Sequence, residues 1–258
     1  MTATALPIRR VLRAYALETR FEIVGALRTV SFAVPFIVVP LAVYLLFGVV
    51  IAGGTAASGP YGPGIANYLF AGFAVMGAIM PGLFSGVILA QEREGNLLRL
   101  KRALPQPPGA SIVAKVLMAM AIAGVSVTLV AIAALLAGKI TLSVGQVAII
   151  WAVLIVGTIP FAAMGLLIGA LVSGSAAPAW GNLVFLPMMW LSGLFIPLPK
   201  FLEKWVIIWP AFHLDQLALG LAGVRQFTFI PPALAAGVLV GVTVLSGGVA
   251  IRRLARVG

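Results

Sequence analysis

The sequence has no cysteine and very little charge. Only 9% of its 258 residues are charged, whereas 62% are hydrophobic. A soluble domain carries about 25% charged residues, because its surface must stay in water. Most of this chain's surface therefore faces something other than water, and the composition predicts an integral membrane protein. The lack of cysteine excludes disulfides and thiolate metal sites.

Acidic residues are scarce, which leaves a formal net charge of +11. Such a surplus can indicate nucleic-acid binding, but that use needs basic residues gathered on one face with interleaved aromatic side chains. Here the basic residues lie between apolar stretches, as topology signals and contacts with anionic lipid headgroups do. We expect the lipid bilayer as a partner and no nucleic acid.

The sequence also lacks the motifs of an enzyme. It has no G-x-x-x-x-G-K-[ST] loop, and Gly138-Lys139 is not preceded by the glycine that such a phosphate-binding loop requires. His213 is the sole histidine, which argues against a histidine metal cluster or a serine–histidine relay, and no G-x-S-x-G elbow is present. We expect no catalytic site, metal or cofactor on this chain; ATP and Mg²⁺, if used, belong to another polypeptide.

Long uncharged intervals show where helices can cross a membrane, because an ionised side chain is costly at mid-bilayer. A span needs roughly 20 residues, and glycine–proline turn formers divide the longest intervals. The intervals predict an all-α membrane protein with six transmembrane helices in one transmembrane domain. The predicted spans are residues 29–52, 66–89, 112–136, 147–171, 179–195 and 231–251.

Two further patterns concern the arrangement of the spans. Thirteen of the 17 basic residues fall in the N-terminal segment, the second connection and the C-terminal tail. This positive-inside bias predicts that both termini are cytoplasmic. Pairs of glycines one turn apart predict close helix packing. These pairs are Gly82 and Gly86, Gly165 and Gly169, and Gly237 and Gly241.

Residues 7–28, before the first span, carry an amphipathic pattern. Ile8, Leu12 and Tyr15 recur at helical spacing, while Arg9 and Arg13 fall on another face. This pattern favours a helix that lies in the headgroup plane of the membrane. The alternative is a plain basic anchor for the first span.

Residues 91–108 connect the second and third spans and contain a short amphipathic pattern. Glu92 and Glu94 precede four leucines with basic residues between them. Acidic residues near the start of a helix and basic residues near its end complement the helix dipole, and Pro105 would end the helix. The pattern predicts a short helix that offers apolar side chains at the membrane surface. The alternative is a solvated turn.

Residues 197–229 follow the fifth span. Phe201, Trp205 and Trp209 repeat every four residues, Pro210 interrupts them, and a second helical pattern follows. Tryptophan prefers the membrane interface, so we expect a short re-entrant helical hairpin in the outer leaflet. The alternative is a seventh span over residues 205–221, which would contain His213.

The last two segments resemble the type-2 permease subunits of ATP-binding cassette (ABC) exporters, in the drug- and sodium-exporter branch. In that family the second span ends in an acidic–basic–acidic run, then Gly-Thr-Leu-Glu-hydrophobic and a later proline. The matching residues here are Glu92, Arg93, Glu94, Gly95, Asn96, Leu97, Leu98, Arg99, Leu100 and Pro105, with Asn96 and Leu98 departing from the pattern. The family's fifth-span signature resembles Ser192, Gly193, Leu194, Phe195, Ile196, Pro197, Leu198 and Pro199, followed by Pro210, His213 and Leu214.

The resemblance implies a function. In the family the short cytoplasmic helix seats in a groove of a separate ATPase subunit, and the outer hairpin lies near the exit. The coupling residues implied here are Glu92, Glu94, Gly95, Leu97, Leu100 and Pro105. The exit residues implied are Ser192, Gly193, Pro197, Trp205, Pro210 and His213.

We therefore expect the permease of an ATP-driven exporter in a bacterial or archaeal cytoplasmic membrane. It would pair with an ABC ATPase and with a second permease, as a homodimer or heterodimer. The apolar, aromatic spans favour a hydrophobic or amphipathic cargo such as a drug, an antibiotic or a lipid, as in multidrug efflux and antibiotic resistance. A stand-alone secondary carrier or channel is the alternative, although carriers usually place ionisable groups within their spans.

Overall fold

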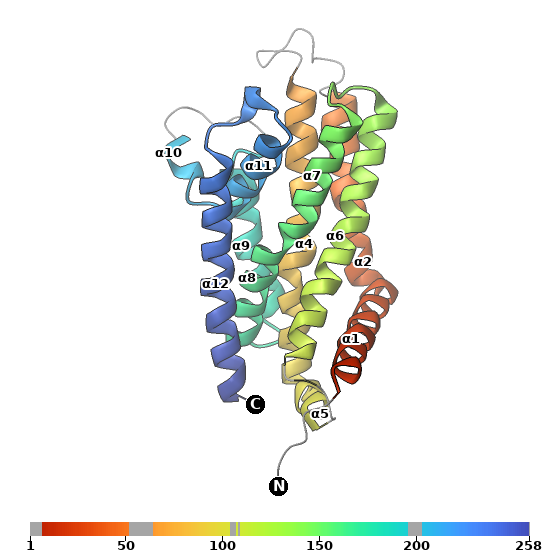
Figure 1. The fold of residues 1–258 in the computed structure, drawn as a ribbon, viewed down its shortest axis with the longest axis vertical. Coiled ribbons are helices and arrows are strands. Elements are labelled where there is room, and N and C mark those ends of the chain that lie inside the picture. The colour runs from red at the N-terminus through yellow and green to blue at the C-terminus, as the bar shows by residue number, and fades with distance from the viewer. Residues whose placement is uncertain (1–6, 52–63, 104–106, 108, 196–202, 258) are drawn as a thin grey trace.

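The computed structural model describes residues 7–51, 64–103, 107, 109–195 and 203–257. In these ranges the chain is a bundle of helices without a strand, shown from the side in Figure 1. The elements in chain order are α1 (Ile8–Arg28), α2 (Val30–Val43), the π-helix η1 (Tyr44–Ile51), α4 (Ile65–Glu94), α5 (Leu97–Ala103), α6 (Ala110–Ala137), α7 (Val144–Val156), α8 (Thr158–Leu171), α9 (Ala177–Leu191), α10 (Glu203–Val206), α11 (Pro210–Leu221), the 3₁₀ helix η2 (Arg225–Phe227) and α12 (Pro232–Val257). The all-α prediction is confirmed.

Among the described residues, five helical segments are long and apolar enough to cross a membrane. They are Val30–Ile51, Ile65–Glu94, Ala110–Ala137, Val144–Leu171 and Pro232–Arg256. Each coincides with one of the predicted spans. The remaining predicted span, residues 179–195, corresponds to α9, whose 15 residues end at Leu191. Five spans are supported in this way, and the six-span arrangement stays a prediction.

Helix α4 is the centre of the bundle, because almost all of its residues from Ala66 to Ala90 are buried. It crosses α8 at backbone distance. A Cβ built on Gly86 would lie 1.7 Å from the Gly165 carbonyl oxygen, and one built on Gly169 would lie 2.3 Å from the Gly86 carbonyl oxygen. Two of the predicted glycine pairs therefore meet each other across this crossing. The third pair, on α12, has no described atom within 4 Å of its Cβ positions.

The span formed by α7 and α8 breaks at Gly157. Pro160 has no N–H to donate to the carbonyl four residues earlier, so one helical hydrogen bond is missing. A Cβ built on Gly157 would lie 2.2 Å from Leu214 Cδ1. The break and the glycine together let α11 pack against this span.

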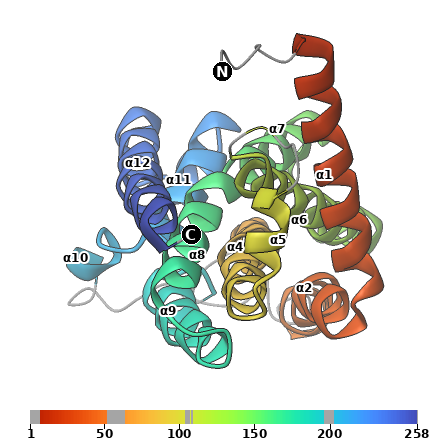
Figure 2. The ribbon, with the colours of Figure 1, turned by 90° about the horizontal axis from the view of Figure 1, so that it is seen from below.

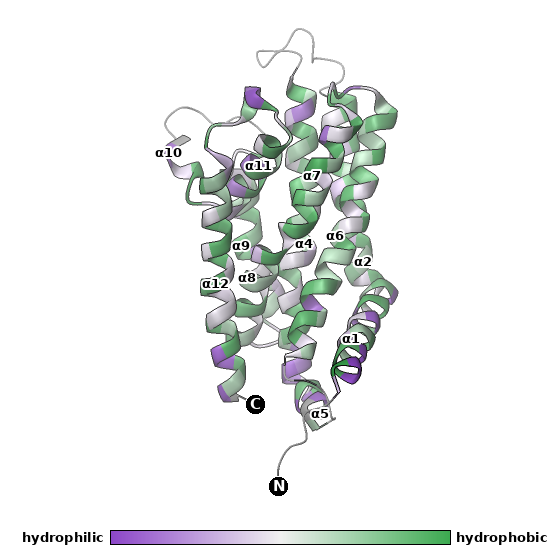
Figure 3. Cartoon of the chain, viewed as in Figure 1, coloured by the Kyte–Doolittle hydropathy of each residue, from purple (hydrophilic) through white to green (hydrophobic). Residues whose placement is uncertain are grey.

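The two ends of the bundle differ in charge. Figure 3 shows hydrophilic residues on α1, on α5 and in the last turns of α12, all toward the lower end of the bundle. We call this the α5 end, and the opposite end, which carries α10 and α11, the α11 end. Seen from below in Figure 2, α1 runs along the edge of the bundle beside α6 and leads into α2. Helices α2 and α9 flank α4 on this side.

Candidate functional site

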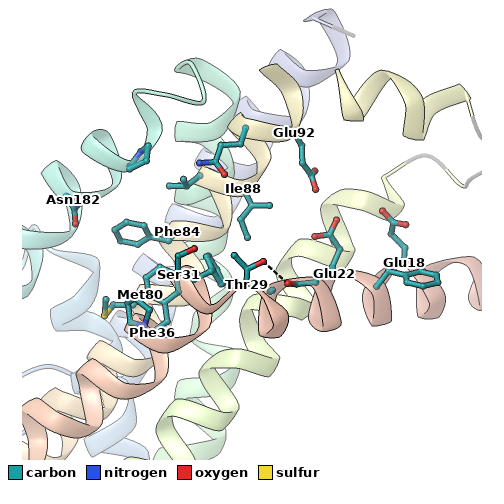
Figure 4. A pocket seen from close by; sticks show the side chains of 18 of the residues that line it. Glu18, Glu22, Thr29, Ser31, Phe36, Met80, Phe84, Ile88, Glu92 and Asn182 are labelled. Atoms are coloured by element: carbon teal, nitrogen blue, oxygen red, sulfur yellow. Dashed lines mark hydrogen bonds between the residues drawn. The ribbon is translucent and has the colours of Figure 1, made fainter. Parts of the chain in front are cut away.

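A cavity of about 830 Å³ opens at the α5 end between α1, α2, α4, α5 and α9. Its volume falls within the range of roughly 300–1,000 Å³ that small-molecule sites occupy. Figure 4 shows it from close by, with carboxylates at one end and aromatic rings toward the other. The cavity therefore has a charged mouth and an apolar interior.

Aromatic rings form the apolar part of the cavity. Phe32 and Phe36 of α2 meet edge to face, with ring centroids 4.4 Å apart. Phe36 also lies 5.1 Å from Phe84 of α4, and Met80 lines the same region. Pro35, next to Phe36 in the chain, is a lining residue as well. These side chains offer an apolar surface on which the flat or alkyl part of a small molecule can pack.

Five charged side chains form a network at the mouth. Lys101 of α5 lies 2.9 Å from Glu18 and 2.6 Å from Glu22, both on α1, and 3.5 Å from Glu92 of α4. Lys115 of α6 lies 3.1 Å from Glu22 and 2.8 Å from Glu92. The lysine of α5 is thus joined by ion pairs to α1 and α4, and shares two of its carboxylates with a second lysine.

The network shifts the proton affinities of its members. Burial alone would raise the pKa of Glu22, but the ammonium groups of Lys115 and Lys101 outweigh it and lower that pKa. Burial likewise disfavours charged Lys101, but hydrogen bonds to Glu22 and Glu18 outweigh it and raise its pKa. Both groups are therefore charged at neutral pH, and the ion pairs persist there.

Two neighbours of Glu92 attach the end of α4 to other elements. Arg93 donates hydrogen bonds to the carbonyl oxygens of Ala170 and Val172, at the C-terminus of α8. Glu94 accepts one from the N–H of Ser175, 3.2 Å away, just before α9. The acidic–basic–acidic run therefore contacts α5 and α6 through its first residue, α8 through its second and the α8–α9 turn through its third.

The turn from α4 into α5 explains one departure from the family pattern. Asn96 has φ of +59°, and it is the one non-glycine residue with positive φ in the described part of the chain. Asparagine tolerates this left-handed conformation, whereas a β-branched threonine there is strained. Asparagine at position 96 thus suits a sharp reversal directly after Gly95.

Helix α5 presents apolar side chains at the surface. Leu100 is 65% exposed and Leu97 is 41% exposed, while Leu98 packs against a small cluster that includes Leu254 of α12. The predicted short helix is present, but Pro105, expected to end it, lies outside the described residues. Of the coupling residues expected from sequence, Glu92 and Glu94 contact other parts of this chain, and Leu97 and Leu100 face outward.

At the α11 end the fifth-span signature forms a helix stop. Ser192 donates its hydroxyl to the Met188 carbonyl oxygen, and Gly193 follows with φ of +69°, a conformation that favours glycine. Phe195 then stacks on Phe73 of α4, with centroids 4.7 Å apart. Pro197 lies outside the described residues, so its predicted role is not described by the structure.

Helix α11 buries polar side chains. Pro210 begins the helix, where its missing N–H leaves no hydrogen bond unmade. His213 is 1% exposed, and its Nε2 lies 2.8 Å from the Ile207 carbonyl oxygen. Asp215 is 3% exposed, and burial raises its pKa to about 7 although Gln216 hydrogen-bonds to it. Trp205, by contrast, is 62% exposed.

The role of the two lysines and of the acidic residues of α1 was not predicted from the sequence. Glu18 and Glu22 are one helical turn apart and are the only acidic residues of the N-terminal segment. That isolation was a usable signal, because paired acids on a basic amphipathic helix need nearby cations. Their partners Lys101 and Lys115 come from distant segments, which no local pattern reveals.

Two comparisons bear on what this arrangement does. The family of membrane proteins described as "ABC-2 type transporter" matches residues 14–229. The match begins within α1 and continues through η2, so it includes the cavity, the charged network and α11. Comparison with individually curated proteins found no match. Among the described residues, no group of three histidine, aspartate or glutamate side chains is placed to hold a metal ion.

Proposed function

Because the chain belongs to the ABC-2 type transporter family, we propose that it is the permease subunit of an ATP-driven exporter for hydrophobic or amphipathic molecules. Five membrane-spanning helices and the family assign it to membrane transport. In the proposal α9 supplies a sixth span, the α5 end is cytoplasmic, and a separate ABC ATPase supplies the energy. The α11 hairpin lies near the exit, on the outer side of a bacterial or archaeal cytoplasmic membrane.

The attachment of α5 carries the proposal. Leu97 and Leu100 face away from the bundle, where a partner's apolar groove can receive them. Lys101 of the same helix is joined by ion pairs to α1 and α4 at the mouth of the cavity. A force on the outer face of α5 therefore reaches the walls of the cavity through contacts of 2.6–3.5 Å.

The mechanism follows from this connection. ATP binding closes two partner ATPases, and the closure moves the α5 helices of two permeases. Movement of α5 displaces Lys101 from its carboxylates and favours the outward-facing member of a pre-existing two-state equilibrium. Cargo that has entered the cavity from the cytoplasm or inner leaflet is then released near α11. The exposed apolar faces of α2 and α12 remain available for lipid or the second permease.

Capture of the partner tests the proposal. The tagged chain is purified in mild detergent from its own membranes, and copurified proteins are identified by mass spectrometry. We expect an ABC ATPase with the wild-type chain. Leu100→Arg should lose it, because a charge on the exposed face of α5 cannot enter an apolar groove without desolvation. Ile208→Arg, at a 60% exposed apolar position of the α11 end, should retain it.

Two results would count against the exporter. If no ATPase copurifies with the wild-type chain, a stand-alone carrier or channel becomes the better explanation. If Leu100→Arg retains the ATPase as fully as Ile208→Arg does, then α5 is not the coupling helix. Gly95→Trp in the α4–α5 turn should uncouple ATP hydrolysis from transport while membrane insertion stays normal.

Cysteine labelling tests the orientation. The chain has no cysteine of its own, so single cysteines at the exposed positions Arg99 and Lys139 report the two ends without background. A membrane-impermeant maleimide added to whole cells should label position 139 and spare position 99. The reverse pattern would invert the proposed topology.

A further inference from the structure

The cavity has a surplus of negative charge at its mouth. The charged residues that line it are Glu18, Glu22, Glu92 and Lys101. Lys115, the other cation of the network, has a side chain that is 0% exposed and lies behind the lining. Even when both lysines are counted, three carboxylates face two ammonium groups. The network is one positive charge short of neutrality.

Glu18 is the carboxylate with the least compensation. Glu22 and Glu92 each pair with both lysines, whereas Glu18 pairs with Lys101 and otherwise accepts a hydrogen bond from Ser111, 3.2 Å away. Its side chain is 14% exposed and lines the cavity. In this partly buried setting a unit charge interacts more strongly than in bulk water, because the surrounding protein screens it less. A cation in the cavity is attracted here, and an anion is repelled.

The rest of the cavity suits an apolar body. Phe32, Phe36 and Phe84 present rings to it, and the faces of such rings attract cations rather than anions. Asn182 of α9 also faces the cavity, and its amide has no hydrogen bond with a described residue. A polar amide six residues into an apolar helix is costly unless it meets a partner. The cavity thus offers an aromatic surface, a free amide and a negative mouth together.

We infer that this cavity binds amphipathic organic monocations, with the positive charge beside Glu18 and the apolar body against Phe32, Phe36 and Phe84. If the bound monocation is also the transported cargo, the inference rests in that respect on the proposed function. Glu18 is the residue that sets the charge preference. The cavity volume of about 830 Å³ admits a molecule with several rings.

Two probes of nearly equal size and opposite charge test this. The purified chain is placed in nanodiscs of zwitterionic lipid, and equilibrium binding of tetraphenylphosphonium and tetraphenylborate is measured, with empty nanodiscs subtracted. We expect the cation to bind at least about tenfold more tightly than the anion. Glu18→Gln should weaken the cation about tenfold and leave the anion unchanged or tighter.

Two control variants separate charge from fold. Glu94→Gln removes a carboxylate near the same membrane edge that does not line the cavity, so it should change neither affinity. Phe84→Ala should weaken both probes, and the cation somewhat more, because it removes apolar surface that both probes use and a ring face that attracts cations. The comparison of the two probes on the wild-type chain requires no variant, so it stands even if one variant fails to fold.

Equal affinities, tighter binding of the anion, or binding of neither probe would overturn the inference. If Glu18→Gln leaves the ratio of cation to anion affinity unchanged, then Glu18 does not set the charge preference. The assay contains no ATP and no ATPase. If the cation preference is absent, the exporter assignment is therefore unaffected. If instead no ATPase is captured but the cation binds, the site belongs to a carrier or channel.

Discussion

Carboxylates are half-buried at the α5 end of the bundle and buried at the α11 end, and their surroundings differ. At the α5 end, Glu18, Glu22 and Glu92 lie within 3.5 Å of lysine ammonium groups. At the α11 end, Asp215 is 3% exposed and accepts one hydrogen bond from Gln216, and its second oxygen has no described hydrogen-bond partner. The α5 end is thus stabilised by charge, whereas the α11 end favours a neutral carboxyl group.

This difference fits the work that each end does in the proposed transporter. An ion-pair network between helices is rigid while its pairs persist. When one helix moves, as the proposed transport cycle requires of α5, the same charged groups can form other pairs. A buried carboxyl without a cation instead favours the protonated form. We therefore expect the seating of α11 against the bundle to depend on pH near neutrality, and the position of α5 not to depend on it there.

The largest expected effect comes from breaking the charged network at its centre. Lys115→Met leaves Glu22 and Glu92 with Lys101 alone, at a site where the lysine side chain is 0% exposed. Removing one partner of buried ion pairs costs about 3–5 kcal/mol. We expect a loss of that size in the free energy of unfolding, measured by denaturation in mixed micelles.

Two variants check the cause of that loss. Lys139→Met removes an exposed lysine from the opposite end and should change stability by less than about 0.5 kcal/mol. Adding Glu92→Gln to Lys115→Met should recover part of the loss, because it removes one uncompensated carboxylate. If Lys115→Met is no less stable than Lys139→Met, the network does not hold the α5 end together.

The second expected effect concerns Asp215. Its pKa in the folded chain is about 7, against about 4 for an exposed aspartate. A raised pKa means that the folded state binds the proton more tightly, so stability is full below about pH 4 and falls as pH rises to about 7. Asp215→Asn should remove this dependence and be more stable than wild type above pH 7, by about 2–4 kcal/mol.

Titration of the α5 end sharpens the contrast. The pKa of Glu22 is lowered in the folded chain. Glu22 therefore contributes to the free energy of unfolding above the pKa of an exposed glutamate, and this contribution is lost as the pH falls through the lowered pKa. Thermal unfolding from pH 3 to pH 8.5 should show Glu22→Gln losing the acid-side slope and Asp215→Asn losing the neutral-side slope. Identical pH profiles for wild type and Asp215→Asn would show that Asp215 is ionised in the folded chain.

Most of the bundle follows from sequence because its signals are local. Charge-free intervals gave five of the helices that the structure shows, since the cost of an ionised side chain in lipid depends on position alone. Glycine spacing predicted close helix packing, which the structure shows at Gly86 and Gly165, but it did not predict that α4 and α8 are the helices that meet there. The break at Gly157 follows from the local signal of Pro160. The packing of α11 against it could not be predicted, because Leu214 is distant in sequence.

The charged network could not be predicted, although every member is visible in the sequence. Glu92 and Glu94 were singled out together, yet they differ in their partners: one pairs with two lysines, and the other accepts a backbone hydrogen bond from Ser175. Residues two positions apart on a helix point about 200° apart, so the two carboxylates face different neighbours, and only the tertiary packing decides which of them meets a cation. The cavity was missed for the same reason, since its walls come from α1, α2, α4, α5 and α9.

The smallest expected effect concerns the middle residue of the acidic–basic–acidic run. Arg93→Met removes two hydrogen bonds to the carbonyl groups at the end of α8. Bonds to a charged donor contribute about 1.5–3 kcal/mol each at most, and partial exposure to water reduces this, so we expect a loss of about 1–2 kcal/mol. Glu94→Gln, which keeps an acceptor for the Ser175 N–H, should cost less. No loss in Arg93→Met would mean that these hydrogen bonds do not hold the end of α8 to α4, and that the glycine crossing does so by itself.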